Sequence, residues 1–212
     1  MIVPLLTDEN KMSKVVSNRL VDKVYELSDA DVADLCDAAE SAILDGGGFG
    51  WLKPPPRDFL ERYWRGVLLV PERELFVGSF GGRIVSSAQL VRPPRNNEAQ
   101  HRIATITTNF VAPWARGHGL ARDLTMACER AAKRHGVRFI NLDVRETQQA
   151  AIQLYESFGY ECWGTNPNYA FVNGKTIAGR YYTKDLRQNS KQKTPAKKTS
   201  AKKAPEKKAL KK

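Results

Sequence analysis

The stretch Thr107–Arg122, TTNFVAPWARGHGLAR, joins a strand-like segment to a helix-like segment through a glycine turn. Residues 103–111 are largely apolar and β-branched, in near alternation, which predicts a strand. The strand should end close to Pro113, because proline cannot donate a hydrogen bond to a sheet. From Leu120 onward the apolar residues recur at helical spacing. The sequence therefore predicts strand, glycine turn and helix in succession.

The predicted turn has the properties of an anion site. Glycines allow the backbone to turn tightly and to approach a ligand closely. The first turn of a helix leaves several N–H groups without an intrahelical partner, and the helix dipole adds positive charge there. A phosphate group suits such a helix N-terminus. A glycine turn before a helix is also common as an ordinary connection, and this segment alone leaves that alternative open.

A second segment downstream repeats the pattern. Residues 139–144 predict a buried strand, and a short polar loop follows them. The next apolar residues recur at helical spacing as far as Phe158, and Gly159 is placed to close that helix in the left-handed conformation. The chain thus presents two strand–loop–helix units in close succession.

The two units together resemble the signatures of the GNAT superfamily of N-acetyltransferases. Arg116-x-x-Gly119-x-Ala121 is similar to the family motif Q/R-x-x-G-x-G/A, which wraps the pyrophosphate of coenzyme A. The segment 151–160, AIQLYESFGY, is similar to the second motif, whose helix ends Ala-Ile-x-Leu-Tyr-Glu-x-x-Gly-Phe. Both occur in the family order and at the family separation. The resemblance is strong over residues 104–160 and extends over residues 20–186.

The resemblance implies a fold of the mixed α/β (α+β) class. It predicts a central mixed sheet of six to seven strands, helices on both faces, and two central parallel strands that splay apart. The implied order is β-α-α-β-β-β-α-β-α-β-β over residues 20–186. The expected strands are 20–27, 74–80, 84–91, 103–111, 139–144, 160–164 and 179–184, with a loop at 165–169 and a turn at 173–174. The expected helices begin at the cap Ser28, near Asp58, at Leu120 and before Ala150.

The resemblance also implies acetyl-CoA as co-substrate, with direct transfer of its acetyl group to a primary amine of a small molecule or a protein. Tyr155 stands where the family places the Tyr that can protonate the leaving sulfur, although its helical spacing would equally suit a core residue. Backbone groups of Asn109 and Val111 would hold the pantetheine chain. Gln148 stands where the family often has Asn. The predicted cofactor-binding residues are Asn109, Phe110, Val111, Arg116, Gly117, His118, Gly119, Leu120, Ala121 and Gln148.

The sequence leaves the general base and the acceptor open. Glu98 precedes the predicted strand 103–111, Asp143 lies on the predicted strand 139–144, and Glu146 follows it. Any of them could act through a water, and a substrate amine could also lose its proton to solvent. The resemblance places the acceptor near the loop 46–56 and the last strands. An aromatic-lined pocket there would suit a small amine or a cation, and the alternative is that these rings are ordinary core. The aromatic candidates are Phe49, Trp51, Trp163, Tyr169, Tyr181 and Tyr182.

The net charge of +11 belongs mostly to the C-terminal segment. Residues 191–212 hold ten Lys and one Glu, which account for nine of the eleven positive charges. The composition predicts that residues 187–212 form a disordered basic tail and that residues 1–19 form a flexible arm. The tail indicates weak, salt-dependent contact with nucleic acid or a solvated extension without a partner. A third alternative is that its lysines are themselves acetylated by the domain. The alternative function is therefore a nucleic-acid-associated protein whose domain binds coenzyme A without catalysis.

Three cysteines without metal-ligand spacing indicate a reduced, cytoplasmic protein and no metal site. We expect Cys36, Cys128 and Cys162 to be small buried apolar side chains. No apolar run approaches the roughly 20 residues of a membrane span, and the N-terminus lacks the features of a secretory signal. The oligomeric state is left open.

Overall fold

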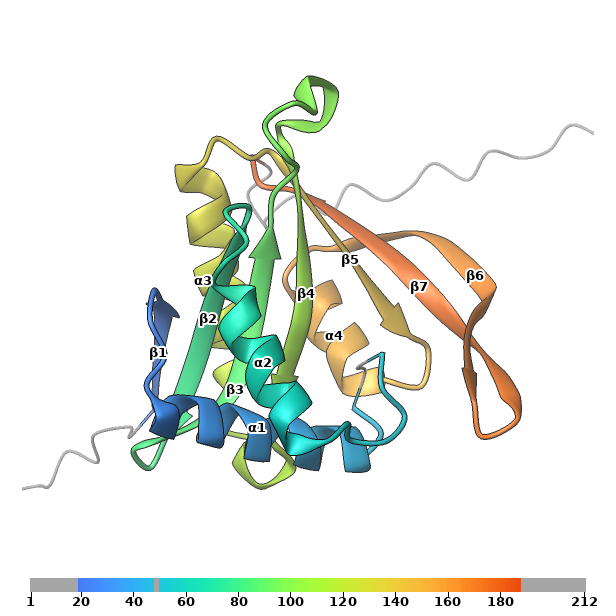
Figure 1. Cartoon of the computed structure of the whole chain (residues 1–212). Helices are drawn as coiled ribbons and strands as arrows, with labels where there is room; N and C mark the ends of the chain where they lie inside the picture. Colours follow the sequence, from blue (N-terminus) through green and yellow to red (C-terminus); the bar gives the residue numbers. More distant parts are fainter. Residues whose placement is uncertain (1–18, 48–49, 188–212) are drawn as a thin grey trace, which may run out of the picture.

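The structure, a computed structural model, describes residues 19–47 and 50–187 as one seven-stranded sheet with helices packed on it (Figure 1). The strand order is β1-β2-β3-β4-β5-β7-β6. The strands are β1 (Arg19–Val24), β2 (Arg73–Phe80), β3 (Arg83–Val91), β4 (Ile103–Val111), β5 (Phe139–Arg145), β6 (Glu161–Val172) and β7 (Lys175–Asp185). The helices are α1 (Asp29–Leu44), α2 (Arg57–Val67), α3 (Leu120–Arg134) and α4 (Gln149–Ser157), with short 3₁₀ turns at Glu98–Gln100 and Pro113–Ala115. The predicted element order is confirmed.

The sheet is mixed because β4 and β5 run parallel while the other neighbouring strands are antiparallel. The parallel pairing extends only from Ile103↔Phe139 to Thr105↔Asn141. Both strands continue well beyond that point, to Val111 and Arg145. Their ends therefore separate, and the predicted splay of the two central strands is confirmed.

Helices cover both faces of the sheet, as the sequence predicted (Figure 1). One hydrophobic cluster contains the buried faces of α1 and α2, and a second contains those of α3 and α4. Strand alternation feeds both clusters: Leu75 and Val77 of β2 belong to the first, and Phe76 between them belongs to the second. No described helix has the length and apolarity needed to cross a bilayer.

The start of α1 shows how local sequence sets an element boundary. The Ser28 hydroxyl oxygen accepts a hydrogen bond from the backbone N–H of Asp31 at 3.2 Å. The Asp31 carboxylate in turn accepts from the backbone N–H of Ser28 at 2.9 Å. This reciprocal pair is the capping box that the sequence indicated, and it satisfies two backbone donors at the helix N-terminus.

The C-terminal hairpin differs from the prediction. The expected loop at 165–169 lies inside β6, and the register against β7 shifts between Asn166 and Ala170 instead of breaking. The irregularity absorbs Pro167, which could not extend a regular ladder. The predicted turn is present, with positive φ at both Asn173 and Gly174. A bulge thus replaces the loop, and the two last strands are much longer than expected.

The edges of the predicted domain also shift slightly. Arg19 already belongs to β1, and β1 ends at Val24, before the expected residue 27. Cys162 is exposed on β6, which corrects the expectation that all three cysteines are buried. Cys36 and Cys128 are buried, as expected. The predicted arm before residue 19 and the predicted tail after residue 187 lie outside the described residues.

Candidate functional site

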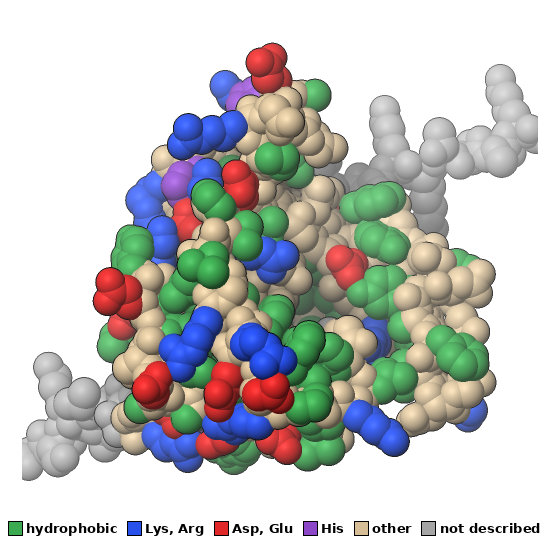
Figure 2. Space-filling view, in the orientation of Figure 1, with side chains coloured by type: hydrophobic (Ala, Val, Ile, Leu, Met, Phe, Trp, Pro, Cys, Tyr) green, Lys and Arg blue, Asp and Glu red, His purple; other side chains and the backbone are tan. Residues whose placement is uncertain are grey.

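A pocket of about 390 Å³ opens where β4 and β5 separate. Figure 2 shows the surface hollowed between the body of the molecule and the projecting β6–β7 hairpin. The walls come from residues 106–110 of β4, residues 142–145 of β5, the side of α4, and aromatic residues from three other elements. The pocket reaches both faces of the sheet, because the α4 residues and the α2 residues on its walls come from opposite layers.

A bulge in β4 shapes the pocket wall. The register of β4 against β3 shifts between Ser87 and Gln89. On the β4 side, Thr108 takes a φ of 51°, a left-handed conformation that a β-branched residue rarely adopts. Beyond Thr105 the β4 backbone no longer pairs with β5. The strand edge there presents N–H and C=O groups toward the gap, which is an arrangement suited to an extended ligand.

Tyr155 of α4 lies at this gap, where it lines the pocket with only 6% of its surface exposed. Its oxygen accepts a hydrogen bond from Nδ2 of Asn109 at 3.1 Å. The same Nδ2 donates to Oγ1 of Thr125 at 3.3 Å. The Thr125 hydroxyl group donates its own hydrogen bond to the carbonyl oxygen of Ala121 at 2.8 Å. The Thr125 oxygen can therefore only accept, which fixes the NH₂ side of Asn109 toward Thr125 and Tyr155.

This arrangement leaves the Tyr155 proton available. Because the phenol oxygen accepts from Asn109, its own O–H is not used in that bond and can donate into the pocket. Burial raises the pKa of Tyr155 well above its usual range, the Asn109 hydrogen bond lowers it, and the nearby acidic groups of Cys128 and Asp143 raise it further. The group is therefore held protonated at neutral pH, as a proton donor must be.

Asn109 was predicted to act through its backbone, and in the structure its side chain also donates hydrogen bonds to Thr125 and Tyr155. The Oδ1 atom of Asn109 is buried and has no hydrogen-bond partner among the described residues. Sequence reasoning missed Thr125, although a hydroxyl on the otherwise apolar buried face of α3 was a signal that could have identified it. Phe110 lines the pocket one residue further along, and its ring centroid lies 6.2 Å from that of Trp64.

The glycine turn has the geometry that an anion site requires. Gly117 and Gly119 have φ values of 84° and 82°, a region that favours glycine. Gly119 is the N-cap of α3, and no side chain caps that helix end. The Arg19 guanidinium donates to the His118 carbonyl oxygen and pairs with Asp123 at 2.9 Å. The uncapped N-terminus of α3 with its backbone N–H groups therefore lies at this turn, beside the ion pair of Arg19 and Asp123.

The remaining predicted cofactor-binding residues lie partly in the core and partly at the glycine turn. The His118 ring stacks on Phe80, with centroids 4.2 Å apart. Leu120 is buried in the core, so its side chain is structural and only its backbone faces the turn. The Val111 carbonyl oxygen accepts from Nε of Arg116 at 3.3 Å. Ala121 contributes its carbonyl to Thr125. The contacts of these residues with the cofactor stay predictions.

Arg116 and Gln148 hold the loop between α1 and α2. Arg116 Nη1 lies 2.6 Å from Oδ2 of Asp45, and Gln148 Nε2 donates to the carbonyl oxygen of Gly46 at 2.9 Å. Gln148 also lines the pocket. This loop places Trp51 on the pocket wall. Arg116 of the predicted cofactor turn and Gln148 at the start of α4 therefore both hold the loop that forms this wall.

The predicted aromatic residues divide into two groups. Trp51 and Tyr169 line the pocket. Trp163 and Tyr181 instead form a ring pair on the hairpin, with centroids 5.5 Å apart, and neither lines the pocket. Tyr182 is fully buried, and its hydroxyl group donates to Glu156 at 3.1 Å. Tyr182 is therefore a core residue, which agrees with the alternative stated for these rings, whereas Trp163 and Tyr181 are not on the pocket wall. Phe49 lies outside the described residues.

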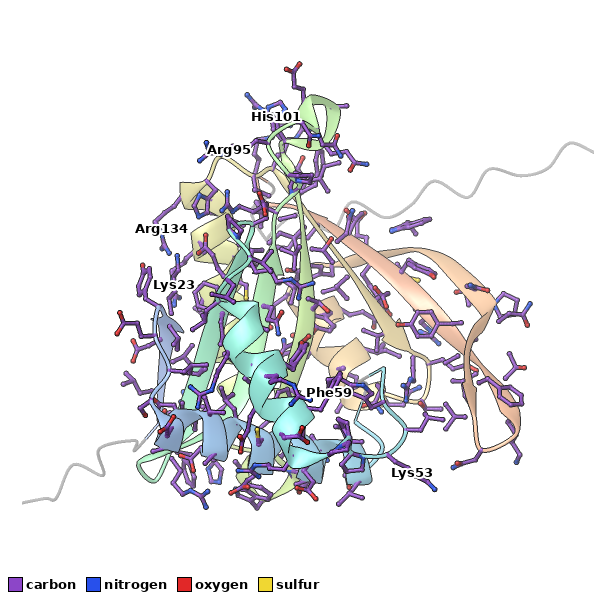
Figure 3. All side chains as sticks on the ribbon, in the orientation of Figure 1. Lys23, Lys53, Phe59, Arg95, His101 and Arg134 are labelled. Carbon is purple, nitrogen blue, oxygen red and sulfur yellow. The ribbon has the colours of Figure 1, made fainter. Side chains whose placement is uncertain are left out.

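Tyr63 of α2 is an aromatic wall residue that sequence reasoning missed. Its ring centroid lies 5.3 Å from that of Trp51, nearly at right angles. Phe59, labelled in Figure 3 on the same helix, packs edge-on against Trp51 at 6.1 Å. The apolar spacing of α2 gave no signal that separated Tyr63 from the core residues around it, such as Leu60 and Trp64.

Of the three candidate bases, only Asp143 lines the pocket. Its Oδ2 accepts a hydrogen bond from the Tyr169 hydroxyl group. Glu98 lies in the 3₁₀ turn on the connection before β4, which projects from the other end of the sheet near Arg95 and His101 (Figure 3). Glu146 follows the end of β5. In the part of the chain that the structure describes, no cluster of three or more His, Cys, Asp or Glu side chains could hold a metal ion.

Comparisons with known proteins identify the family and the fold. Residues 35–160 match the family model described as the acetyltransferase (GNAT) family. The chain is similar to an uncharacterized N-acetyltransferase encoded in the hisH–hisA intergenic region of Azospirillum brasilense. The two are 61% identical over 129 residues, which are 61% of this chain and 77% of that protein.

Two solved structures share the fold. An N-acetyltransferase from Staphylococcus aureus Mu50 is 20% identical, with a TM-score of 0.69, over 81% of this chain and 100% of that one. YncA from Salmonella typhimurium, solved with its cofactor acetyl-CoA, is 16% identical, with a TM-score of 0.67, over 81% of this chain and 96% of that one.

Proposed function

The chain belongs to the acetyltransferase (GNAT) family, and on that premise we propose that it moves an acetyl group from acetyl-CoA directly to a primary amine, with Tyr155 as general acid. The observation that carries the proposal is that the buried Tyr155 lines the pocket while its oxygen accepts a hydrogen bond from Asn109, which leaves the Tyr155 O–H as a donor. The similarity in fold to YncA, a protein solved with acetyl-CoA, supports the choice of acetyl donor.

The residues of the chain fit this co-substrate. Bound acetyl-CoA would supply the acetyl group as a thioester. The turn 116–121, with two glycines at positive φ and an uncapped helix end, would bind the pyrophosphate through backbone N–H groups. The unpaired edge of β4 at Asn109 and Val111 would hold the pantetheine chain through backbone hydrogen bonds.

Tyr155 would lower the barrier by protonating the sulfur as the thioester bond breaks. A positioned general acid contributes typically 10²- to 10⁴-fold to the rate. Asn109 and Thr125 would act as positioning residues, because they direct the phenol proton away from the protein and toward the pocket. Burial keeps the Tyr155 hydroxyl group protonated, while the hydrogen bond from Asn109 lowers its pKa and so favours transfer of the proton to the leaving sulfur.

The test is Tyr155→Phe, assayed by release of the coenzyme A thiol with a panel of primary amines. We expect kcat to fall about 100-fold, with the dissociation constant of acetyl-CoA unchanged in calorimetry, because only the hydroxyl group is lost. Tyr160→Phe is the matched control: its ring packs against Tyr155 with centroids 5.5 Å apart, but it does not line the pocket. This control should change kcat less than threefold.

Two outcomes would contradict the proposal. If Tyr155→Phe retained full activity on its best amine, the general-acid role would be wrong. If the unaltered chain bound no acetyl-CoA, or bound it and acetylated no amine, the transferase chemistry proposed for this site would be wrong.

A further inference from the structure

Arg19 at the start of β1 holds the glycine turn from outside. The sequence predicted residue 19 as the end of a flexible arm, whereas in the structure it is the first residue of a strand. Its Nη1 donates to the carbonyl oxygen of His118, and its Nε lies 2.9 Å from Oδ2 of Asp123. The guanidinium group therefore joins the peptide unit before α3 to the first turn of that helix.

The neighbouring strand holds the same turn residue. Arg19 of β1 and Phe80 of β2 are Cα partners in the sheet. The Phe80 ring stacks on the His118 ring, with centroids 4.2 Å apart and planes 22° apart. Two facing residues of the sheet thus hold His118, one by its carbonyl group and one by its ring.

Gly119 fits closely against the Arg19 guanidinium. A Cβ atom at residue 119 would lie 3.0 Å from Nη1 of Arg19 and 3.4 Å from its Cζ. The φ of 82° at Gly119 also strains any residue with a side chain. Both the backbone conformation and the approach of Arg19 therefore favour glycine at this position.

The contact fixes the direction of the peptide unit between His118 and Gly119. No peptide bond in the described residues is cis, and the C=O and N–H of a trans peptide point in opposite directions. Because the His118 C=O points to Arg19, the Gly119 N–H points away from it. Within residues 19–47 and 50–187 this N–H has no hydrogen-bond partner, so it is available to a ligand at the turn.

We propose that Arg19 is a positioning residue for the pyrophosphate of acetyl-CoA, because it holds the His118 carbonyl group so that the Gly119 N–H faces the phosphate oxygens. This inference rests on the proposed use of acetyl-CoA and adds a residue outside the matched range 35–160. Glycine permits rotation of this peptide unit, which would turn a carbonyl oxygen toward the anion. A contact from outside the turn is therefore needed to keep the donor in place.

Asp123 separates the position of Arg19 from its charge. The Asp123 carboxylate lies beside the turn and holds Nε of Arg19. If charge alone mattered, removal of this negative group would tighten the binding of an anion. If Asp123 holds Arg19 in place, its removal weakens anion binding although the turn becomes more positive.

The experiment measures the dissociation constants of coenzyme A and of pantetheine by calorimetry with the full-length protein. Pantetheine lacks the pyrophosphate, so it reports on the rest of the site. Arg19→Gln should weaken the binding of coenzyme A about tenfold and change that of pantetheine less than about twofold. The variant should fold, because a partly exposed ion pair adds little to stability. In acetyl transfer the KM for acetyl-CoA should rise with kcat unchanged, because Arg19 does not line the pocket.

Two further variants complete the test. Asp123→Ala should weaken the binding of coenzyme A about threefold or more, and it covers the case in which Arg19→Gln does not fold. Arg130→Gln is the matched control, because it removes the same charge from an exposed position of α3, roughly 16 Å further along the helix. It should change the binding of coenzyme A by less than about twofold.

The outcomes separate this inference from the proposed function. Unchanged binding of coenzyme A by Arg19→Gln, or tighter binding by Asp123→Ala, would overturn the positioning role. Equal losses for coenzyme A and pantetheine would also overturn it, because Arg19 would then support only the fold. If coenzyme A binds as expected but no amine is acetylated, the proposed transfer is wrong while the role of Arg19 stands. Absence of coenzyme A binding by the unaltered chain would overturn both.

Discussion

At the scale of single residues, Glu74 is the most heavily engaged buried charge. Its carboxylate on β2 is 5% exposed, lies 3.0 Å from Nζ of Lys23, and contacts Nε2 of His135. Arg92 Nε lies 3.8 Å away. These partners come from β1, the end of α3 and the segment after β3, so one carboxylate joins four parts of the chain far from the pocket. A buried charge with such partners is costly to leave unpaired.

Glu74 gives a pH dependence of stability. Burial raises the pKa of Glu74, but the hydrogen bond from Lys23 and the positive charge of His135 lower it more, so it lies below the usual value. The group therefore stabilises the fold fully above the pKa of an unfolded Glu, about 4.3. That contribution is lost as the pH falls below this value and through the lower folded pKa. Glu74→Gln should cost about 2 kcal/mol at pH 7.

Urea unfolding at a series of pH values measures this effect. The stability difference between wild type and Glu74→Gln should shrink between about pH 5 and pH 3. Glu98→Gln is the control, since Glu98 is exposed in a 3₁₀ turn, and it should shift stability by less than about 0.5 kcal/mol. A difference for Glu74→Gln that stays constant down to pH 3 would mean that the carboxylate is not held in its charged form.

The role of Asn109 shows what residue-level prediction missed. The sequence predicted the motif around Tyr155 and the strand around Asn109. It did not predict the hydrogen bond between Asn109 and Tyr155, because this bond depends on the register of β4. A one-residue shift moves side chains to the other face of a strand, and the bulge that causes the shift has no glycine to mark it.

At the scale of elements, the bulge in β4 and the bulge in β6 give the pocket a shape that regular strands could not form. The first opens the gap at Thr108, and the second turns Tyr169 toward it. The sequence predicted the parallel pair and its splay through the family resemblance, and it predicted α1, α3 and α4 from caps and apolar spacing. It missed the length of β6, because Asn166 and Pro167 are typical loop residues that here lie in an irregular strand.

The strained bulge residue gives a prediction at this scale. Thr108 has a φ of 51°, which costs a β-branched residue about 1 kcal/mol or more, whereas asparagine tolerates this conformation. Thr108→Asn should therefore stabilise the protein by about 1 kcal/mol and raise its Tm by about 3 °C. Thermal unfolding followed by circular dichroism measures the change.

The adjacent Thr107→Asn is the matched control for the bulge. Thr107 lies in extended strand, paired with Gln89 of β3, where asparagine is disfavoured. This change should lower the Tm. Equal effects of the two substitutions would show that the backbone at Thr108 is not strained in solution.

At the scale of the whole molecule, the charge is divided unevenly along the chain. Residues 191–212 carry nine of the eleven net positive charges, and the family match ends at residue 160. In the part of the chain that the structure describes, the residues of the pocket, the glycine turn and both hydrophobic clusters all precede the basic segment. The catalytic chemistry and the basic segment can therefore be tested as independent parts of one chain.

Deletion of residues 188–212 tests whether the basic segment binds nucleic acid. We expect the shortened chain to acetylate small amines with unchanged kcat/KM, because no residue placed at the pocket is removed. Fluorescence anisotropy with a short DNA duplex should show binding by the full chain that weakens steeply with salt, by about 0.9 in log K per phosphate neutralised for each unit of log salt. The shortened chain, with a net charge of only +2, should show none.

A full-length variant with the ten segment lysines changed to Gln separates charge from length. Equal DNA binding by all three chains would place the contact on the folded domain, and loss of acetyl transfer on deletion would show that the two parts are not independent.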